Sequence, residues 1–363
     1  MSKSSIGTEP VYDARTLGAP RMFILGLQHM FAMFGATVLV PALSGLDVAT
    51  TLLFAGIGTL LFHLLTKGKV PAFLGSSFAF IGGYNAVRTI GTNADGSAIY
   101  NNDLLAYACF GVAIAGLMYI ILSTLFKIFG VKKVMRYFPP IVTGPIIIAI
   151  GLNLSSSAIN NCTGNWWIAI AAILIIVAAN IWGKGMIKII PILLGVIGSY
   201  VVAVICDASV RETLAQNVAN AKWFALPIYK DETVFGLFMN GNVDTHMLLT
   251  AVITIVPLSL ATMVEHIGDV SAISSTCNRN YIENPGLHRT LMGDGLATTL
   301  AALFGAPANT TYGENTGVLA LSKVYDPRVI RLAAVYAIIL SFSPKFDALV
   351  NSIPSAIVGG VSF

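Results

Sequence analysis

Long apolar runs separated by short polar loops organise the chain. An α-helix needs about 20 mostly apolar residues to cross a bilayer. Runs of this kind predict spans at 22–43, 48–66, 104–127, 139–158, 166–182, 189–206, 246–268, 291–305 and 329–344. Composition agrees, because 56% of the 363 residues are hydrophobic and only 10% are charged, against roughly 25% charged in soluble domains. We therefore expect an all-α polytopic membrane protein that sits in a lipid bilayer and binds no nucleic acid.

Two further apolar segments are too short or too interrupted to be ordinary spans. They are 70–90, around VPAFLGSSFAFIGG, and 306–322, APANTTYGENTGVLALS. Their glycines, small hydroxyl residues and β-branched or aromatic residues suit an extended stretch followed by a short helix. Non-helical backbone is tolerated at membrane depth only where it is buried or lines a cavity, and a half-helix that starts there points free N–H groups into that cavity. The alternative is that both segments are ordinary spans of poor hydropathy.

Lysine and arginine placement orients these segments. If the N-terminus is cytoplasmic and every segment crosses, only five of the 21 basic residues fall outside: Arg88, Arg211, Lys222, Lys230 and Lys345. The remaining basic residues are cytoplasmic, as the positive-inside rule expects. The asymmetry holds only if both interrupted segments cross the membrane.

The interrupted segments also occupy matching places. One is third in order and the other is tenth, which is the third of a second half when each half has seven segments. An odd number per half gives the two halves opposite topology, and such broken segments indicate a carrier site near the bilayer midplane. A twelfth segment begins near Pro354 and stops at Phe363, so we expect a seven-plus-seven inverted repeat truncated after about eleven segments.

Three acids are singled out at membrane depth: Glu265 and Asp269 in the eighth segment and Glu314 in the tenth. Ionisable groups there are costly and usually line a substrate or ion path. Glu265 and Asp269 are four residues apart, so they share one helix face. Two bland alternatives stay open. Glu265 could pair with His266, and Asp269 could be solvated near the inner end of its helix.

The three acids suggest a chemistry. Since no lysine or arginine lies in the interior to neutralise them, Glu265, Glu314 and Asp269 are candidate proton carriers. A protonated carboxyl group offers a donor and an acceptor side by side, which suits the planar imide edge of uracil, although other small amides would fit. The metal and aspartyl signatures HExxH and GxGD of intramembrane enzymes are absent. We therefore expect a proton-coupled carrier rather than an enzyme, with no catalytic residue, metal or cofactor.

Five stretches resemble the nucleobase/ascorbate transporter family, most closely its bacterial uracil carriers. They are LQHMFAMFGATVLVPAL (27–43), KVPAFLGSSFAFI (69–81), EHIGDV (265–270), NPGLHRTLMGDGL (284–296) and PANTTYGENTGVLALSKVY (307–325). The resemblance runs over nearly the whole chain. It implies proton symport of uracil or a related nucleobase across the inner (plasma) membrane. A homodimer is a further family expectation.

The resemblance also implies a domain plan. A core domain would comprise segments 1–4 (residues 1–132) and 8–11 (residues 244–350). A gate domain would comprise segments 5–7 with the outer loop (residues 133–243) and, at residues 351–363, the start of the truncated segment 12. The substrate would bind where core and gate meet.

Carried over by motif, Glu265 and Glu314 would hydrogen-bond the base. The backbone N–H groups of Phe78 and Gly313 would face its carbonyls, and Ala36, Phe78 and Tyr312 would pack on its ring. Three further residues would support these from behind: His29, Ser77 and Asn315. For His29, the bland alternative is a satisfied core histidine.

Departures from the family pattern leave the exact base open. One uracil carrier of the family has a histidine where this chain has Asp269, whereas other members, including purine carriers, have an aspartate. Purine and urate carriers often have glutamine at the position of Glu314, so the acid there favours a pyrimidine. A purine- or xanthine-type carrier is the alternative, and an anion transporter of the same fold ranks lowest.

Overall fold

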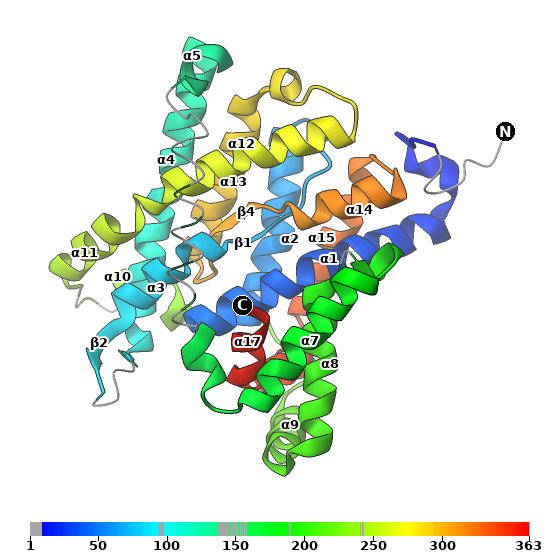
Figure 1. Ribbon diagram of the computed structural model, residues 1–363. Helices are drawn as coiled ribbons and strands as arrows, with labels where there is room; N and C mark the ends of the chain where they lie inside the picture. Colours follow the sequence, from blue (N-terminus) through cyan, green and yellow to red (C-terminus); the bar gives the residue numbers. More distant parts are fainter. Residues whose placement is uncertain are drawn as a thin grey trace.

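The structure is a computed structural model of the chain. It describes residues 9–93, 98–136, 158–188, 190–239, 241 and 243–362, together with the single residues 145, 148, 152 and 155. The predicted span 139–158 therefore lies almost wholly outside the described residues. In the part that is described, the chain is built mainly of helices, with four very short strands (Figure 1).

The helices have the following bounds. The first half contains α1 (Ala19–Ser44), α2 (Val48–Leu65), α3 (Ile81–Arg88), α4 (Leu105–Phe129), α5 (Val131–Met135), α7 (Trp166–Trp182), α8 (Pro191–Cys206) and α9 (Ala208–Asn220). The second half contains α10 (Val234–Met239), α11 (Thr245–Ile255), α12 (Leu258–Thr276), α13 (Leu287–Leu303), α14 (Glu314–Ser322), α15 (Pro327–Ser341), α16 (Pro344–Asn351) and α17 (Ser355–Ser362). The strands are β1 (Leu74–Ser76), β2 (Thr89–Thr92), β3 (Ala98–Tyr100) and β4 (Asn309–Thr311).

Several helices of the described residues are long and apolar enough to cross a membrane. Four qualify outright: Ala19–Ser44, Val48–Leu65, Asn102–Phe129 and Thr245–Thr276. The number rises to six if two bent pairs count as one span each, α8 with α9 and α15 with α16. All of them begin within about one helical turn of a predicted span. The prediction of an all-α, multi-pass membrane protein is confirmed.

One predicted boundary is wrong. The span expected at 246–268 continues as α12 to Thr276. The polar serines beyond residue 268 do not end the helix, because the hydroxyl groups of Ser271 and Ser274 donate to the carbonyls of Ile267 (2.8 Å) and Val270 (2.6 Å). Such bonds to the preceding turn satisfy the hydroxyl group inside a helix. Asp269 is consequently an interior residue of α12.

The two interrupted segments cross one another, which confirms the predicted extended stretches in segments three and ten. β1 and β4 pair antiparallel, with Leu74 opposite Thr311 and Ser76 opposite Asn309. Beyond β1 the chain enters a 3-10 turn and then α3, and beyond β4 it enters α14. Figure 1 shows the two half-helices leaving this crossing in opposite directions.

Each crossing strand is held by a buried threonine of a neighbouring helix. Thr59 of α2 accepts a hydrogen bond from Leu74 N (2.9 Å) and donates to Leu74 O (3.2 Å). Thr298 of α13 forms the same two hydrogen bonds with Asn309: it accepts from the backbone N–H (3.2 Å) and donates to the carbonyl (2.9 Å). Both threonines are 0% exposed. Because a buried unpaired backbone group is costly, these contacts allow extended backbone to exist in the middle of a helical protein.

Small residues bring the helices around the crossing close together. α13 packs on both α2 and α4, and α15 packs on α1 and α2. At the contact of α4 with α13, a Cβ atom added to Gly116 would lie 2.7 Å from the carbonyl oxygen of Gly295. Glycine pairs of this kind are how membrane helices approach closely. A second group, α7, α8 and α17, packs together to one side of the crossing (Figure 1).

The chain before α1 forms an N-terminal clasp, which we define as residues 11–17. Val11 pairs with the turn after α14, donating to the Lys323 carbonyl (2.8 Å) and accepting from Tyr325 N (2.8 Å). The Tyr12 hydroxyl donates to the carbonyl of Cys277 at the end of α12 (2.9 Å). The clasp therefore ties together the ends of α12 and α14.

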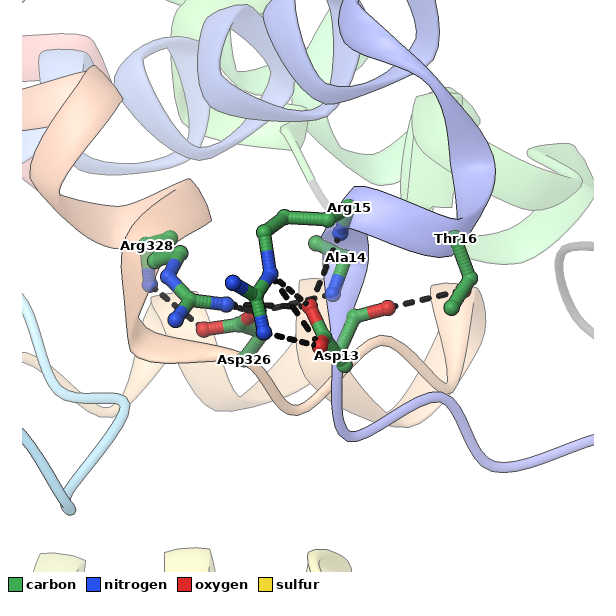
Figure 2. A network of polar contacts seen from close by, with 6 residues as sticks. All are labelled: Asp13, Ala14, Arg15, Thr16, Asp326 and Arg328. Carbon is green, nitrogen blue, oxygen red and sulfur yellow. Dashed lines mark hydrogen bonds and ion pairs between the residues drawn. The ribbon is translucent and has the colours of Figure 1, made fainter.

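An acidic pair anchors the same clasp to the start of α15 (Figure 2). Asp326 accepts a hydrogen bond from Ala14 N (2.8 Å) and one from Arg328 N (2.9 Å). The Arg328 guanidinium reaches both Asp13 (2.9 Å) and Asp326 (3.2 Å). Asp13 also forms an ion pair with Arg15, with 2.6 Å between its Oδ2 atom and the Arg15 Nη2 atom.

Candidate functional site

The candidate site lies where α12 passes the starts of the two half-helices. α12 contacts β4, α14 and the 3-10 turn Phe78–Phe80 that precedes α3. Gly313 occupies the N-cap position of α14, and Glu314 is the first residue of that helix. The N-terminus of a helix carries free N–H groups and a partial positive charge, which favours an acidic group there. Local sequence therefore places Glu314 beside the crossing.

Glu265 and Asp269 approach the same place from α12. A Cβ atom added to Gly313 would lie 3.2 Å from Oδ1 of Asp269, so this carboxylate lies against the start of α14. Glu265 is close enough to Glu314 for their charges to interact, and Asp269 is close enough to both. The structure thus brings together the three acids that the sequence singled out.

These carboxyl groups differ from buried structural acids in their surroundings. Glu265 and Glu314 are exposed and Asp269 is partly exposed. Among the described residues none of the three forms an ion pair. An acid at membrane depth with no cation beside it is a group that can take up and release a proton or bind a polar solute.

The contacts of His266 and Asp269 bear on the two alternative explanations of these acids. His266 does not pair with Glu265, because its Nδ1 atom lies 2.8 Å from Asp294 of α13. Asp269 does not lie at a helix end, because α12 continues to Thr276. Its carboxylate is partly exposed and lies beside Gly313.

The apolar residues expected to pack on a bound base lie at different depths. Phe78 is partly exposed, whereas Ala36 and Tyr312 are only 2% and 5% exposed. The Tyr312 hydroxyl donates to the Ser76 carbonyl (2.7 Å), and its ring packs so closely on Gly75 that a Cβ there would come 2.6 Å from it. Of the three, Phe78 is the side chain open to a ligand in this conformation, and the other two form part of the packed wall behind the crossing.

The residues expected behind the site make contacts of their own. His29 is 0% exposed, and its carbonyl accepts a hydrogen bond from the Asn315 side chain (3.0 Å). This contact ties α1 to the first turn of α14. Ser77 is 5% exposed and donates its backbone N–H to the Ala308 carbonyl (2.9 Å), which extends the strand pairing by one residue.

The sequence reading missed Asp294. It lies within the predicted span 291–305 and is 0% exposed, as is the side chain of its partner His266. The signal was present, since an acid inside an apolar span is as unusual as Glu265 or Glu314. Within the described ranges, no three His, Cys, Asp or Glu side chains are grouped so as to hold a metal ion.

The chain is similar to known proteins over most of its length. A family profile described as the permease family matches residues 20–363. The uracil permease of Bacillus caldolyticus is 39% identical over 361 residues, covering 97% of this chain and 78% of that protein. The putative pyrimidine permease RutG of Escherichia coli (strain K12) is 37% identical over 349 residues, covering 93% of this chain and 73% of that protein.

A solved structure shares the fold. The transmembrane domain of the cyanobacterial bicarbonate transporter BicA aligns with a TM-score of 0.63 and 13% identity, covering 94% of this chain and 86% of that one. At this identity the likeness concerns the fold alone. The family match and the related permeases, by contrast, extend over the stretches that carry Glu265, Asp269 and Glu314. The chain belongs to the permease family of nucleobase/ascorbate transporters.

Proposed function

We propose that this protein is a secondary carrier that imports uracil, or a closely related nucleobase, together with protons. The observation that carries the proposal is the meeting of Glu265, Asp269 and Glu314 beside the start of α14, where none of them forms an ion pair with another described residue. The curated relatives are named as uracil and pyrimidine permeases, which supports a pyrimidine as the substrate.

Recognition would use the edge of the base. A protonated carboxyl group of Glu265 or Glu314 matches the alternating N–H and C=O groups of an imide edge. The backbone N–H groups of Phe78 and Gly313, at the starts of the two half-helices, would meet the carbonyl oxygens. The ring would rest against Phe78, with Ala36 and Tyr312 in the wall behind it.

Coupling would use the same acids. A carboxyl group that binds the base only when protonated makes substrate and proton bind together, which is the thermodynamic requirement for symport. Asp269 lies against Gly313 and close to the other two acids, so a proton could pass among the three. Neither a metal nor an organic cofactor is needed for this cycle.

The architecture we propose follows the family plan. Core segments at 1–132 and 244–350 would carry the site, and gate segments at 133–243 and 351–363 would flank it. The matching threonine contacts at Thr59 and Thr298 support an inverted repeat, because each occupies the same place relative to its strand. The protein would lie in the plasma (inner) membrane with a cytoplasmic N-terminus, and dimerisation would use the gate.

Transport into proteoliposomes tests the proposal. Labelled uracil should accumulate when the outside is more acidic than the lumen, and unlabelled uracil should compete more strongly than xanthine or uric acid. Equal accumulation with and without the imposed pH gradient would reject proton coupling. Stronger competition by xanthine than by uracil would instead identify a purine-type carrier.

A further inference from the structure

A buried aspartate outside the three-acid site holds two of its elements together. Asp294 of α13 is 0% exposed. Its Oδ2 atom lies 2.8 Å from His266 Nδ1 and accepts a hydrogen bond from Thr311 N (3.1 Å), while Oδ1 accepts one from the Thr311 hydroxyl (2.9 Å). These three contacts occupy both carboxylate oxygens, and hydrogen bonding of this kind lowers the cost of burying a carboxyl group.

The two partners of Asp294 are neighbours of the acids in sequence. His266 follows Glu265 on α12, and Thr311 ends β4 just before the turn that leads to Glu314. Asp294 itself is enclosed, whereas Glu265 and Glu314 are exposed, and it is close enough to Glu265 and Asp269 for their charges to interact. The network therefore connects the backbones that carry the acids without taking part in the open site.

His266 depends on this network for its anchoring. Its Nδ1 atom lies near Asp294 and near the Thr311 hydroxyl (3.2 Å), whereas its Nε2 atom is buried with no hydrogen-bond partner among the described residues. Since Nε2 has no partner in the described part of the chain, the bonds at Nδ1 set the orientation of the ring. They thereby also fix α12 against β4 at the level of Glu265.

We propose that Asp294 is a positioning residue, which sets the spacing of Glu265 and Glu314 through His266 and Thr311 and never touches the substrate. Only the predicted effect on uracil binding rests on the proposed function. Its structural part, the fixed spacing of α12 and α14, does not depend on what the substrate is.

The test uses two variants of Thr311, which change one partner of Asp294, and one variant of Asp294 itself. Thr311→Val removes the hydroxyl donor and keeps the β-branched shape, whereas Thr311→Ser keeps the donor. We expect Thr311→Val to weaken uracil binding about tenfold, the worth of one hydrogen bond to a charged group, while Thr311→Ser binds within about twofold of the parent. Asp294→Asn should weaken binding, exchange and pH-driven uptake together.

A proton-carrying role for Asp294 would look different. Asp294→Asn would then bind and exchange uracil like the parent and lose only gradient-driven accumulation, and this result would overturn the positioning proposal. Parent-like binding by Thr311→Val would overturn it as well. Monodisperse elution of each purified variant confirms that a loss is not unfolding.

A distance measurement separates this inference from the proposed function. Spin labels on Ser275→Cys and Leu321→Cys, both exposed positions of α12 and α14, report the spacing of the two helices in a chain where the exposed Cys206 is replaced by serine. Thr311→Val should shift or broaden this distance, and Thr311→Ser should not. An unchanged distance in Thr311→Val rejects the inference, whereas failure of the parent to bind uracil rejects only the proposed substrate.

Discussion

The carboxylate of Asp269 lies against the backbone of Gly313, so close that a Cβ atom on Gly313 would come 3.2 Å from its Oδ1 atom. Contacts this short require the neighbouring atoms to move, and here the neighbour is one of the three acids of the site. Glycine is not demanded by backbone conformation, because the φ of Gly313 is −68° and its ψ is −32°. The absence of a side chain at this position therefore makes room for Asp269.

Gly313→Ala should consequently disturb binding without disturbing the fold. The added methyl group displaces Asp269 from the start of α14, and we expect uracil binding to weaken by roughly tenfold, or about 1.4 kcal/mol. Isothermal titration of the purified variant measures the change. Its melting temperature should stay close to that of the parent, since alanine favours the helical conformation already present.

Asp269→Ala provides the control for that experiment. Shortening Asp269 leaves space for the new methyl group, so Gly313→Ala should cost far less in the Asp269→Ala background than alone. Contacting residues show this non-additivity, and distant ones do not. Additive losses would mean that the methyl group acts elsewhere.

Neutralising each acid should separate binding from coupling. Glu265→Gln, Glu314→Gln and Asp269→Asn keep side-chain shape but cannot release a proton, so each is expected to lower gradient-driven uracil accumulation. The two glutamine variants should also weaken binding, because the side-chain NH2 group carries a second donor that a protonated carboxyl group lacks, and an amide cannot exchange its donor and acceptor positions. Glu212→Gln, on the exposed outer face of α9, should behave like the parent. If both glutamine variants bind uracil as the parent does, the site has been assigned to the wrong residues.

The sequence predicts much of this site because its signals are local. Interrupted apolar segments at 70–90 and 306–322 predict extended backbone, and the structure has β1 and β4 there. Acids four residues apart predict a shared face, and Glu265 and Asp269 both reach the start of α14. Each of these inferences needs only helix periodicity and the cost of unpaired groups in a membrane.

The sequence does not predict which side chains pair with one another across different helices and strands. Sequence proximity suggests Glu265 as a partner of His266, but the Nδ1 atom of His266 lies beside Asp294 on another helix. The resemblance implies that Tyr312 packs on the base, but it does not indicate that the ring also packs on Gly75 and that the hydroxyl group donates to the Ser76 carbonyl. Such pairings depend on how α12, α13 and the two strands pack, which periodicity does not determine.

The hydrogen bonds of Thr59 and Thr298 to the two strands should contribute about equally to the free energy of unfolding. Thr59→Val and Thr298→Val each leave an N–H and a carbonyl of extended backbone without a partner, in a place that water does not reach. Each is expected to lower the free energy of unfolding by about 2 kcal/mol, measured by thermal melting in detergent. Thr59→Ser and Thr298→Ser keep the hydroxyl group and should lose much less. A large cost at one strand and none at the other would contradict the matching roles.

The N-terminal clasp should be insensitive to pH across the working range. The hydrogen bond from Arg15 lowers the pKa of Asp13 from 3.8 to about 2. A carboxyl group with a lowered pKa contributes its full stabilisation above its ordinary pKa and loses it as the pH falls from about 4 to about 2. Hydrogen–deuterium exchange of residues 11–17, corrected for intrinsic pH effects, should therefore show constant protection from pH 8 to pH 5 and a loss only in strong acid.

Asp326→Ala should release the clasp at every pH. It removes the acceptor for Ala14 N and one of the two partners of the Arg328 guanidinium, so exchange of residues 11–17 should rise severalfold. Asp207→Ala is a matched control, because Asp207 also accepts from the first turn of a helix, α9, but lies far from the clasp in sequence. Because the clasp joins the ends of α12 and α14, its release should also increase exchange at the C-terminal turn of α12, where Tyr12 bonds the Cys277 carbonyl. Faster exchange confined to residues 11–17 would show that the clasp covers these helix ends without stabilising them.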